Sequence, residues 1–263
     1  MHPASTILNC FVLGVANAAL TRVSNFGSNP SGIQMWIDVP ANVPAKAPIL
    51  VGAKRCYSHY PSSTHDLLCW DAGTKKSLIR DGGGDSQSIV QMVDYALSKY
   101  SADPTRVFVV GTSSGSMMGN VLAAVYPDVF AAASVYSGVA AGCMAVPDGT
   151  PPNPYDPCGL GRLVKTPQQW GDIHGTSDTT VAYQNFIEDL KQWSNVHGVA
   201  FAKNTTNTPD PNYTQMTYGD GTKLTGYSAR GVGHVVPLHP TQALSFFGLE
   251  SMTRCDLGDS GAA

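Results

Sequence analysis

The sequence predicts an α/β fold in which a mostly parallel sheet carries helices on both of its faces. Three short apolar runs, at 48–53, 107–110 and 131–137, are typical of strands that are buried on both sides. Between the first two runs, residues 86–100 repeat their apolar side chains with the period of a helix. Strands that alternate with helices along a chain form parallel sheets, because each helix returns the chain to the edge where the previous strand began.

The chain before these runs is expected to form an antiparallel hairpin. Residues 19–27 and 33–39 have the composition of strands, and 33–39 alternates apolar with polar side chains, as a strand with one solvated face does. The turn-forming residues 29–32, Asn-Pro-Ser-Gly, lie between them.

The strand at 107–110 leads into a sharp turn with a serine at its centre. The turn reads Gly111-Thr112-Ser113-Ser114-Gly115, and residues 116–126 after it can form a helix. A strand, a G-x-S-x-G turn and a helix make up a nucleophile elbow, in which the glycines let the two backbones close around an exposed serine hydroxyl. A plain glycine-rich turn is the alternative. The flanking strand and helix favour Ser113 as a nucleophile in an α/β-hydrolase fold.

The second half of the chain supplies the remaining expected elements. Residues 138–167 are rich in proline and glycine and are expected to form a long loop. Residues 181–196 have the pattern of an amphipathic helix. A hairpin is predicted from 213–218 and 223–228, and a last helix from 240–249.

Length and charge limit the classes of protein to consider. The length suits one catalytic domain, predicted over residues 19–250, and a short polar tail without aromatic residues follows at 251–263. The formal net charge is −3 and Lys and Arg form no cluster, which argues against nucleic acids and anionic membranes as partners. We expect a monomer.

The N-terminus has the pattern of a secretory signal peptide, predicted over residues 1–18. Residues 7–15 are an apolar run too short to span a membrane, and 16–18, Ala-Asn-Ala, form a small-x-small cleavage site. The segment before the run has no Lys or Arg, so an unprocessed, buried N-terminal helix is the alternative. Secretion to the extracellular space is the expectation.

In an oxidising compartment, the cysteines after the signal peptide are expected to form disulfides. Pairing Cys56 with Cys69, and Cys143 with Cys158, closes short local loops and leaves Cys255 over. No cysteine or histidine spacing indicates a zinc site, and no metal or cofactor is expected.

Two glycosylation sequons begin at Asn204 and Asn212. Both lie in a polar stretch, which we expect to be a surface loop.

A serine nucleophile needs a histidine base and a carboxylate that orients the histidine. In α/β-hydrolases the acid and then the histidine follow the serine, on loops after later strands. Asp178 lies in the polar loop 174–180 just before a helix, and His234 lies in a glycine-rich loop after the last strands. These two positions fit that order.

Other histidines and acids fit the chain order of the triad, or its expected loop positions, less well. His239 precedes Pro240 and looks like the start of a helix, and His197 lies at the end of a helix. The remaining competitors are two histidines before the serine and two acids assigned to a loop and to a solvated helix face: His59, His65, Asp172 and Asp189.

Several motifs together resemble the fungal secreted esterases of carbohydrate esterase family one, which include acetylxylan esterases and type B feruloyl esterases. The resemblance covers residues 20–249. It is carried by 25–27 (NFG), 60–63 (YPSS), 69–71 (CWD), 82–86 (GGGDS), 111–118 (GTSSGSMM), 136–139 (YSGV), 166–170 (TPQQW), 174–180 (HGTSDTT) and 231–237 (GVGHVVP).

The resemblance implies a serine esterase that hydrolyses acetyl or feruloyl esters on xylan, a plant cell-wall polysaccharide, without a cofactor. It places the catalytic triad on Ser113, Asp178 and His234. The backbone N–H groups of Ser114 and of a residue near Cys56 would then bind the oxyanion. The family's cysteines fall on Cys56, Cys69, Cys143 and Cys158, in agreement with the local pairing. The choice of acyl group stays open, with a narrow preference for acetyl.

Two segments of the family pattern have no counterpart in this chain. Only residues 57–59 separate Cys56 from the YPSS motif, where relatives carry a helix and a further strand, and a parallel crossover takes about a dozen residues. Almost nothing lies between Trp170 and His174, where relatives carry the strand that presents the acid. We therefore expect a sheet that lacks one or two strands and an impaired catalytic rate. An inactive relative that only binds polysaccharide is the alternative.

Overall fold

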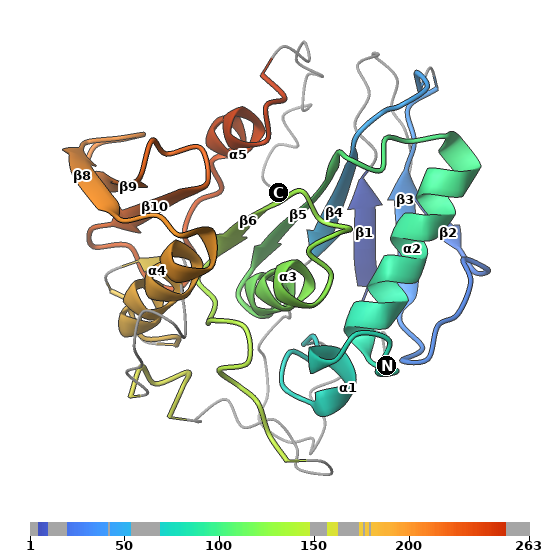
Figure 1. The fold of residues 1–263 in the computed structure, drawn as a ribbon, viewed down its shortest axis with the longest axis horizontal. Helices are drawn as coiled ribbons and strands as arrows, with labels where there is room; N and C mark the ends of the chain where they lie inside the picture. The colour runs from blue at the N-terminus through green and yellow to red at the C-terminus, as the bar shows by residue number, and fades with distance from the viewer. Residues whose placement is uncertain are drawn as a thin grey trace, which may run out of the picture.

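The computed structural model describes residues 5–9, 20–41, 43–53, 69–147, 157–162, 174–175, 177–178 and 180–250. These residues form two sheets and five helices (Figure 1). The larger sheet has the spatial order β2 (Thr21–Val23), β3 (Gln34–Asp38), β1 (Ser5–Asn9), β4 (Ile49–Ala53), β5 (Val107–Thr112), β6 (Ala132–Tyr136). The smaller has the order β7 (His174–Gly175), β10 (Leu224–Ala229), β9 (Tyr213–Tyr218), β8 (Phe201–Thr206). The helices are α1 (Lys75–Leu78), α2 (Asp85–Tyr100), α3 (Ser114–Val125), α4 (Gln184–His197) and α5 (Pro240–Phe246).

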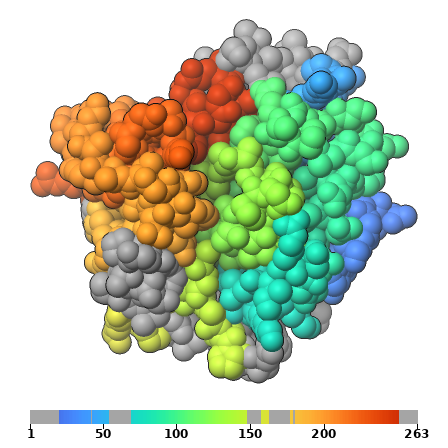
Figure 2. Space-filling model, viewed as in Figure 1, coloured from blue at the N-terminus to red at the C-terminus, as the bar shows by residue number. Residues whose placement is uncertain are grey.

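The sequence predicts the parallel strands β4, β5 and β6, which lie side by side from the middle of the larger sheet to its β6 edge, with helices on both faces. Alternate side chains of β5 point to opposite faces. Val109 joins the main core with α2 and α3, while Phe108 stacks on Phe247 beside α5 with ring centroids 4.6 Å apart. On the face shown in Figure 2, the surface of α3 lies between those of α2, in green, and α4, in orange. The predicted α/β-hydrolase arrangement is confirmed.

The N-terminal hairpin is also confirmed, but β1 was not predicted. β2 and β3 pair antiparallel, as expected. Residues 5–9, inside the predicted signal peptide, form β1 between β3 and β4, parallel to β3 and antiparallel to β4. The sequence predicted no strand at this position of the sheet. Cleavage after Ala18 stays a prediction.

Because β3 and β4 are joined only through β1 in this sheet, a chain that begins at Ala19 should be less stable than the full chain. Each lost hydrogen bond contributes about 1 kcal/mol net. Several such losses should lower the melting temperature by about 10 °C. Thermal denaturation of the two purified chains measures this difference. Equal melting temperatures would show that β1 does not hold the sheet together.

The described part of the strand before Asp178 is β7. β7 has two residues among those described; it pairs with β10 and not with β6. Among the described strands, β6 is the last of the larger sheet and none joins it to the smaller sheet. The residues just before β7, Asp172 included, lie outside the described part of the chain.

Two cysteines of the proline-rich loop are joined. A disulfide links Cys143 to Cys158, whose Cα atoms are 5.7 Å apart, which is the local pairing proposed from the sequence. Both sulfur-bearing residues are buried against Val139 and Val181. Cys69 is disulfide-bonded as well. Its expected partner Cys56, like Cys255, lies outside the described residues.

Removing the Cys143–Cys158 bridge should destabilise the protein by about 3 kcal/mol, because a closed loop of this size loses that much chain entropy on cross-linking. Cys143→Ser together with Cys158→Ser tests the effect by urea denaturation. Peptide mapping without reduction should recover the two cysteines in one linked fragment. A free thiol at either position would contradict the pairing.

Three local expectations were wrong or incomplete. β8 was not predicted, because its six residues are mostly polar and nearly all exposed. Asn204 consequently lies in an exposed edge strand and not in a loop, whereas Asn212 lies in the exposed turn before β9. Asp189 was assigned to a solvated helix face, but it is fully buried, with the Asn120 amide as a neighbour.

Neither a membrane-spanning helix nor a metal-binding cluster is found among the described residues. No helix in this part of the chain is long and apolar enough to cross a membrane. No three His, Cys, Asp or Glu side chains in these ranges are grouped so that they could hold a metal ion.

Candidate active site

Ser113 lies at the junction of β5 and α3, in the strained backbone conformation of a nucleophile elbow. Its φ and ψ are 55° and −124°, which a non-glycine residue rarely adopts. The Ser113 N–H donates to the Tyr136 carbonyl at 2.8 Å, which fixes the turn to the end of β6. The expected elbow is therefore present at Ser113, with the predicted strand before it and the predicted helix after it.

The two motif glycines are required by close backbone contacts. A Cβ on Gly111 would collide with the carbonyl of Gly115, and a Cβ on Gly115 would collide with the carbonyl of Ala53 at the end of β4. No flexible side chain could move aside, because the atoms in the way are backbone. The G-x-S-x-G spacing thus follows from how tightly β4, the elbow and α3 approach one another.

His234 bridges the serine and the acid. Its Nε2 lies 2.9 Å from Ser113 Oγ, and its Nδ1 lies 2.7 Å from Asp178 Oδ2. The His234 side chain is 14% exposed and the Asp178 side chain 0%, so solvent reaches the histidine but not the carboxylate. The order of contacts is hydroxyl, imidazole, carboxylate. This order lets the imidazole accept the hydroxyl proton while its other nitrogen donates to the carboxylate.

The Asp178 carboxylate is held by the backbone that follows it. Oδ1 accepts hydrogen bonds from the N–H groups of Thr180 at 2.8 Å and Val181 at 2.9 Å. The Ser177 N–H donates to the Val232 carbonyl at 3.0 Å, which ties the acid loop to the loop that carries His234. These backbone contacts hold the Asp178 carboxylate beside the histidine.

One of the two expected oxyanion donors can be located. Ser114 is the first residue of α3, so its N–H has no carbonyl one turn earlier in the helix. It lies next to Ser113 at the positive end of the helix dipole. Cys56, near the expected second donor, lies outside the described residues.

A polar network behind the elbow was not assigned from the sequence. The Trp70 N–H donates to Ser114 Oγ at 2.7 Å, and the next residue, Asp71, donates its N–H to Asp85 Oδ2 at 2.9 Å. Asp71 in turn accepts from Ser77 Oγ at 3.0 Å. Burial raises the pKa of Asp85, and the Asp71 N–H opposes that rise. The CWD and GGGDS motifs contain Trp70, Asp71 and Asp85, so the motifs were visible although their contact with the elbow was not.

His239 and His197, the alternative candidates for the base, lie outside the proposed triad. His239 occupies the N-cap position at the start of α5, as predicted, without a side-chain capping bond, and its Nδ1 lies 3.4 Å from Asp210 Oδ2. His197 is the last residue of α4 and stacks on Trp193. Burial lowers the pKa of His197. His59 and His65 lie outside the described residues.

Comparison with known proteins finds esterases among the relatives of this chain. Residues 51–146 match the family described as "Esterase PHB depolymerase". The chain is 39% identical to a feruloyl esterase B of Talaromyces stipitatus, covering 94% of this chain and 80% of the relative. It is 37% identical to acetylxylan esterase A of Aspergillus awamori, covering 88% and 90%.

The chain also resembles a solved structure of the same family in its three-dimensional fold. The acetyl xylan esterase from Aspergillus awamori superposes with a TM-score of 0.79 at 37% identity, over 88% of this chain and 99% of that one. The alignment to the Talaromyces stipitatus relative spans 288 positions, more than the 263 residues of this chain, so that relative carries segments without a counterpart here.

High identity over most of both chains, the shared fold and the hydrogen-bonded Ser113, His234 and Asp178 lead to one conclusion. The chain belongs to the fungal family of feruloyl esterase B and acetylxylan esterase A, whose members are carboxylic ester hydrolases.

Proposed function

We propose that this protein is a secreted serine esterase that hydrolyses acetyl or feruloyl esters on xylan, with Ser113, His234 and Asp178 as its catalytic triad. The observation that carries the proposal is the continuous hydrogen-bond chain from Ser113 Oγ through His234 to Asp178. Its setting supports it, because the hydroxyl lies at a strained elbow at the start of a helix, where developing negative charge is stabilised.

The proposed reaction runs through an acyl-enzyme. His234 Nε2 takes the Ser113 proton as Oγ attacks the ester carbonyl carbon, and the Asp178 carboxylate stabilises the imidazolium that forms. The Ser114 N–H binds the oxyanion of the tetrahedral intermediate, together with a second N–H near Cys56. The intermediate collapses, His234 gives its proton to the leaving sugar oxygen, and the acyl group stays on Oγ. Water, activated by His234, then releases the carboxylic acid by the same steps in reverse.

Whether the protein prefers acetyl or feruloyl esters can be determined by comparing its rates on the two kinds of ester. Relatives named feruloyl esterase B and relatives named acetylxylan esterase A match this chain at 36–41% identity, so the names do not separate the two activities. We propose acetyl esters as the better substrates. The values of kcat/KM on p-nitrophenyl acetate and methyl ferulate, measured side by side, test this proposal. A higher value on methyl ferulate would reverse the assignment.

A second candidate is a family member that binds polysaccharide with little or no catalysis. The observation in its favour is the set of positions in the relative with no counterpart here. Catalytic groups need placement within about 0.5 Å, which a shortened sheet can compromise. Turnover of acetylated xylan, compared with the Aspergillus awamori enzyme under the same conditions, separates the two candidates. An equal rate would rule out an impaired member.

A further inference from the structure

Two successive backbone N–H groups tie the start of α3 to the start of α2. The Trp70 N–H donates to Ser114 Oγ at 2.7 Å, and the Asp71 N–H donates to Asp85 Oδ2 at 2.9 Å. Ser114 is the first residue of α3, and Asp85 is the first residue of α2. Trp70, Ser114 and Asp85 are all buried. Hydrogen bonds in such surroundings are stronger than exposed ones, because water does not weaken them.

The Asp85 side chain is part of a ring of three hydrogen bonds. The Asp71 N–H donates to Asp85 Oδ2, the Asp85 N–H donates to Ser77 Oγ at 3.0 Å, and the Ser77 hydroxyl donates to Asp71 Oδ2 at 3.0 Å. A Cβ on Gly84 would lie 2.6 Å from the Ser77 backbone nitrogen, so the ring can close only because a glycine precedes Asp85. This ring fixes the Asp71 peptide group, and with it the residue before it.

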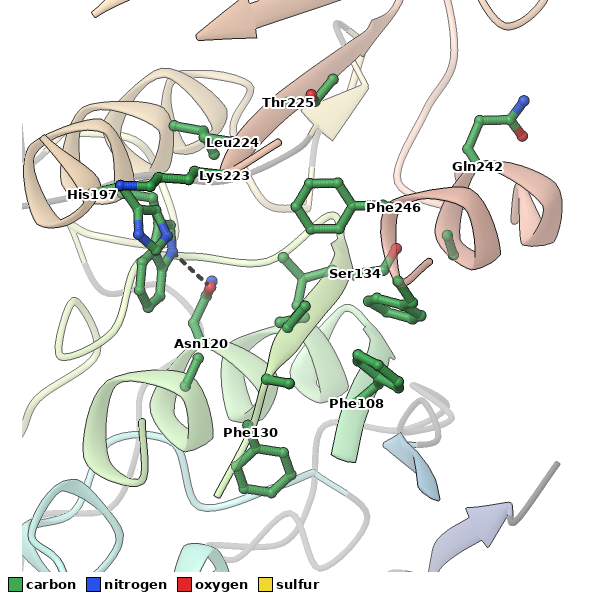
Figure 3. A pocket seen from close by; sticks show the side chains of 18 of the residues that line it. Phe108, Asn120, Phe130, Ser134, His197, Lys223, Leu224, Thr225, Gln242 and Phe246 are labelled. Carbon is green, nitrogen blue, oxygen red and sulfur yellow. Dashed lines mark hydrogen bonds between the residues drawn. The ribbon is translucent and has the colours of Figure 1, made fainter. Parts of the chain in front are cut away.

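The body of α3 is held separately from its first turn. Asn120, in the middle of the helix, accepts a hydrogen bond from Trp193 Nε1 of α4 at 3.1 Å, drawn as a dashed line in Figure 3. Its amide group also donates to the Val139 carbonyl at 3.0 Å. Loss of the bond between Trp70 and Ser114 should therefore leave the helix in place and loosen only its first turn.

We propose that Asp85 is a positioning residue for ester hydrolysis, which holds Ser114 through residues 70–71. The inference rests on the proposed esterase function, in which the Ser114 N–H binds the oxyanion. Such a donor works only when it lies at hydrogen-bond distance from the place that the oxygen takes in the transition state. Misplacement by about 0.5 Å is enough to matter. The bond to the Ser114 hydroxyl limits the movement of the N–H group of the same residue.

The test compares kcat and KM of substituted proteins on p-nitrophenyl acetate. Removing an oxyanion donor outright costs about 10² to 10³ in kcat, and displacing it should cost less. We therefore expect Asp85→Ala and Ser114→Ala each to lower kcat about tenfold, with KM changed less than about twofold, because the interaction is made only in the transition state. Asp85→Asn keeps an oxygen that can accept from the Asp71 N–H, so it should retain most of the activity.

The double variant Asp85→Ala with Ser114→Ala shows whether the two residues act together. If Asp85 acts through the Ser114 hydroxyl, removing both should lower kcat about tenfold, as each single change does, since effects at coupled sites do not add. A loss of about 100-fold would mean that the effects are independent and would overturn the proposal. An unchanged kcat in Ser114→Ala would overturn it as well, even if Asp85→Ala did not fold.

A structural control removes another hydrogen bond of α3, away from the elbow. Trp193→Phe loses the donor to Asn120, so it should lower the melting temperature while kcat stays within about twofold of the unaltered value. Asp94→Ala, at an exposed acid of α2, should change neither quantity. A tenfold loss of kcat in Trp193→Phe would mean that activity follows the stability of α3 in general. That result would overturn the role assigned to Asp85.

Hydrogen exchange at the Trp70 amide tests the same link without a substrate. Asp85→Ala and Ser114→Ala should each speed this exchange about tenfold, because a hydrogen-bonded amide must open before it exchanges. Unchanged exchange in Asp85→Ala would overturn the proposal, whatever the kinetics. If the exchange becomes faster but the unaltered protein hydrolyses no ester, the proposed function fails, while the link from Asp85 to Ser114 stands.

Discussion

Ser113→Ala should abolish ester hydrolysis while leaving the fold intact. Loss of the nucleophile in a serine triad lowers kcat by about 10⁴ to 10⁶. The strained φ and ψ of Ser113 belong to the backbone of the elbow. Replacing serine by alanine removes only the hydroxyl, so the fold should stay intact. The rate on p-nitrophenyl acetate and the far-ultraviolet circular dichroism spectrum of both proteins measure the two halves of this expectation.

The neighbouring serine provides a matched control. Ser114→Ala removes a hydroxyl one residue away that accepts from the Trp70 N–H, but it keeps the backbone N–H proposed to bind the oxyanion. It should therefore lose far less activity than Ser113→Ala. If the Ser113→Ala protein kept more than a few per cent of the activity, the nucleophile would have to be another residue.

Asp178→Asn should lower kcat by about 10⁴, since an amide in this position favours the wrong tautomer of the histidine. Asp178 Oδ2 accepts from His234 Nδ1 at 2.7 Å, and with an amide nitrogen there the ring would present N–H and not a free nitrogen to Ser113. The backbone bonds to Oδ1 keep the side chain in place, so the structure should change little. Steady-state kinetics on the same substrate give the value.

A second histidine–aspartate pair serves as the control for this substitution. Asp210 lies 3.4 Å from His239 and is exposed, so Asp210→Asn removes a carboxylate beside a histidine outside the proposed site. Its kcat should match that of the unaltered protein. A similar loss in both variants would mean that the effect is one of overall charge and not of the His234 contact.

The elements predicted correctly from the sequence are those with a strong local pattern. β5, the elbow and α3 follow one another within twenty residues, and each has a distinct composition. β8 was missed because its polar, exposed residues resemble a loop, and its strand character comes from pairing with β9. β1 was missed because residues 5–9 overlap the apolar run 7–15, which was assigned to a signal peptide.

The contacts within the candidate active site could not be predicted from local sequence patterns. His234 lies 56 residues after Asp178 and 121 after Ser113, so their contact depends on the packing of loops and on no periodic pattern. Chain order narrowed the choice, and resemblance to the esterase family selected the residues. The bond from Trp70 to Ser114 crosses 44 residues and could not be deduced, although both residues belong to motifs that were noticed.

Labelling with a fluorophosphonate probe tests the central claim most directly, because only a serine activated by a correctly placed base reacts with it. The probe is added to the native protein, and mass spectrometry of the digested product locates the adduct. We expect one stoichiometric adduct on Ser113, with loss of esterase activity in step with labelling and no adduct in Asp178→Asn within the same time. An unlabelled Ser113 in a protein that hydrolyses p-nitrophenyl acetate would contradict it.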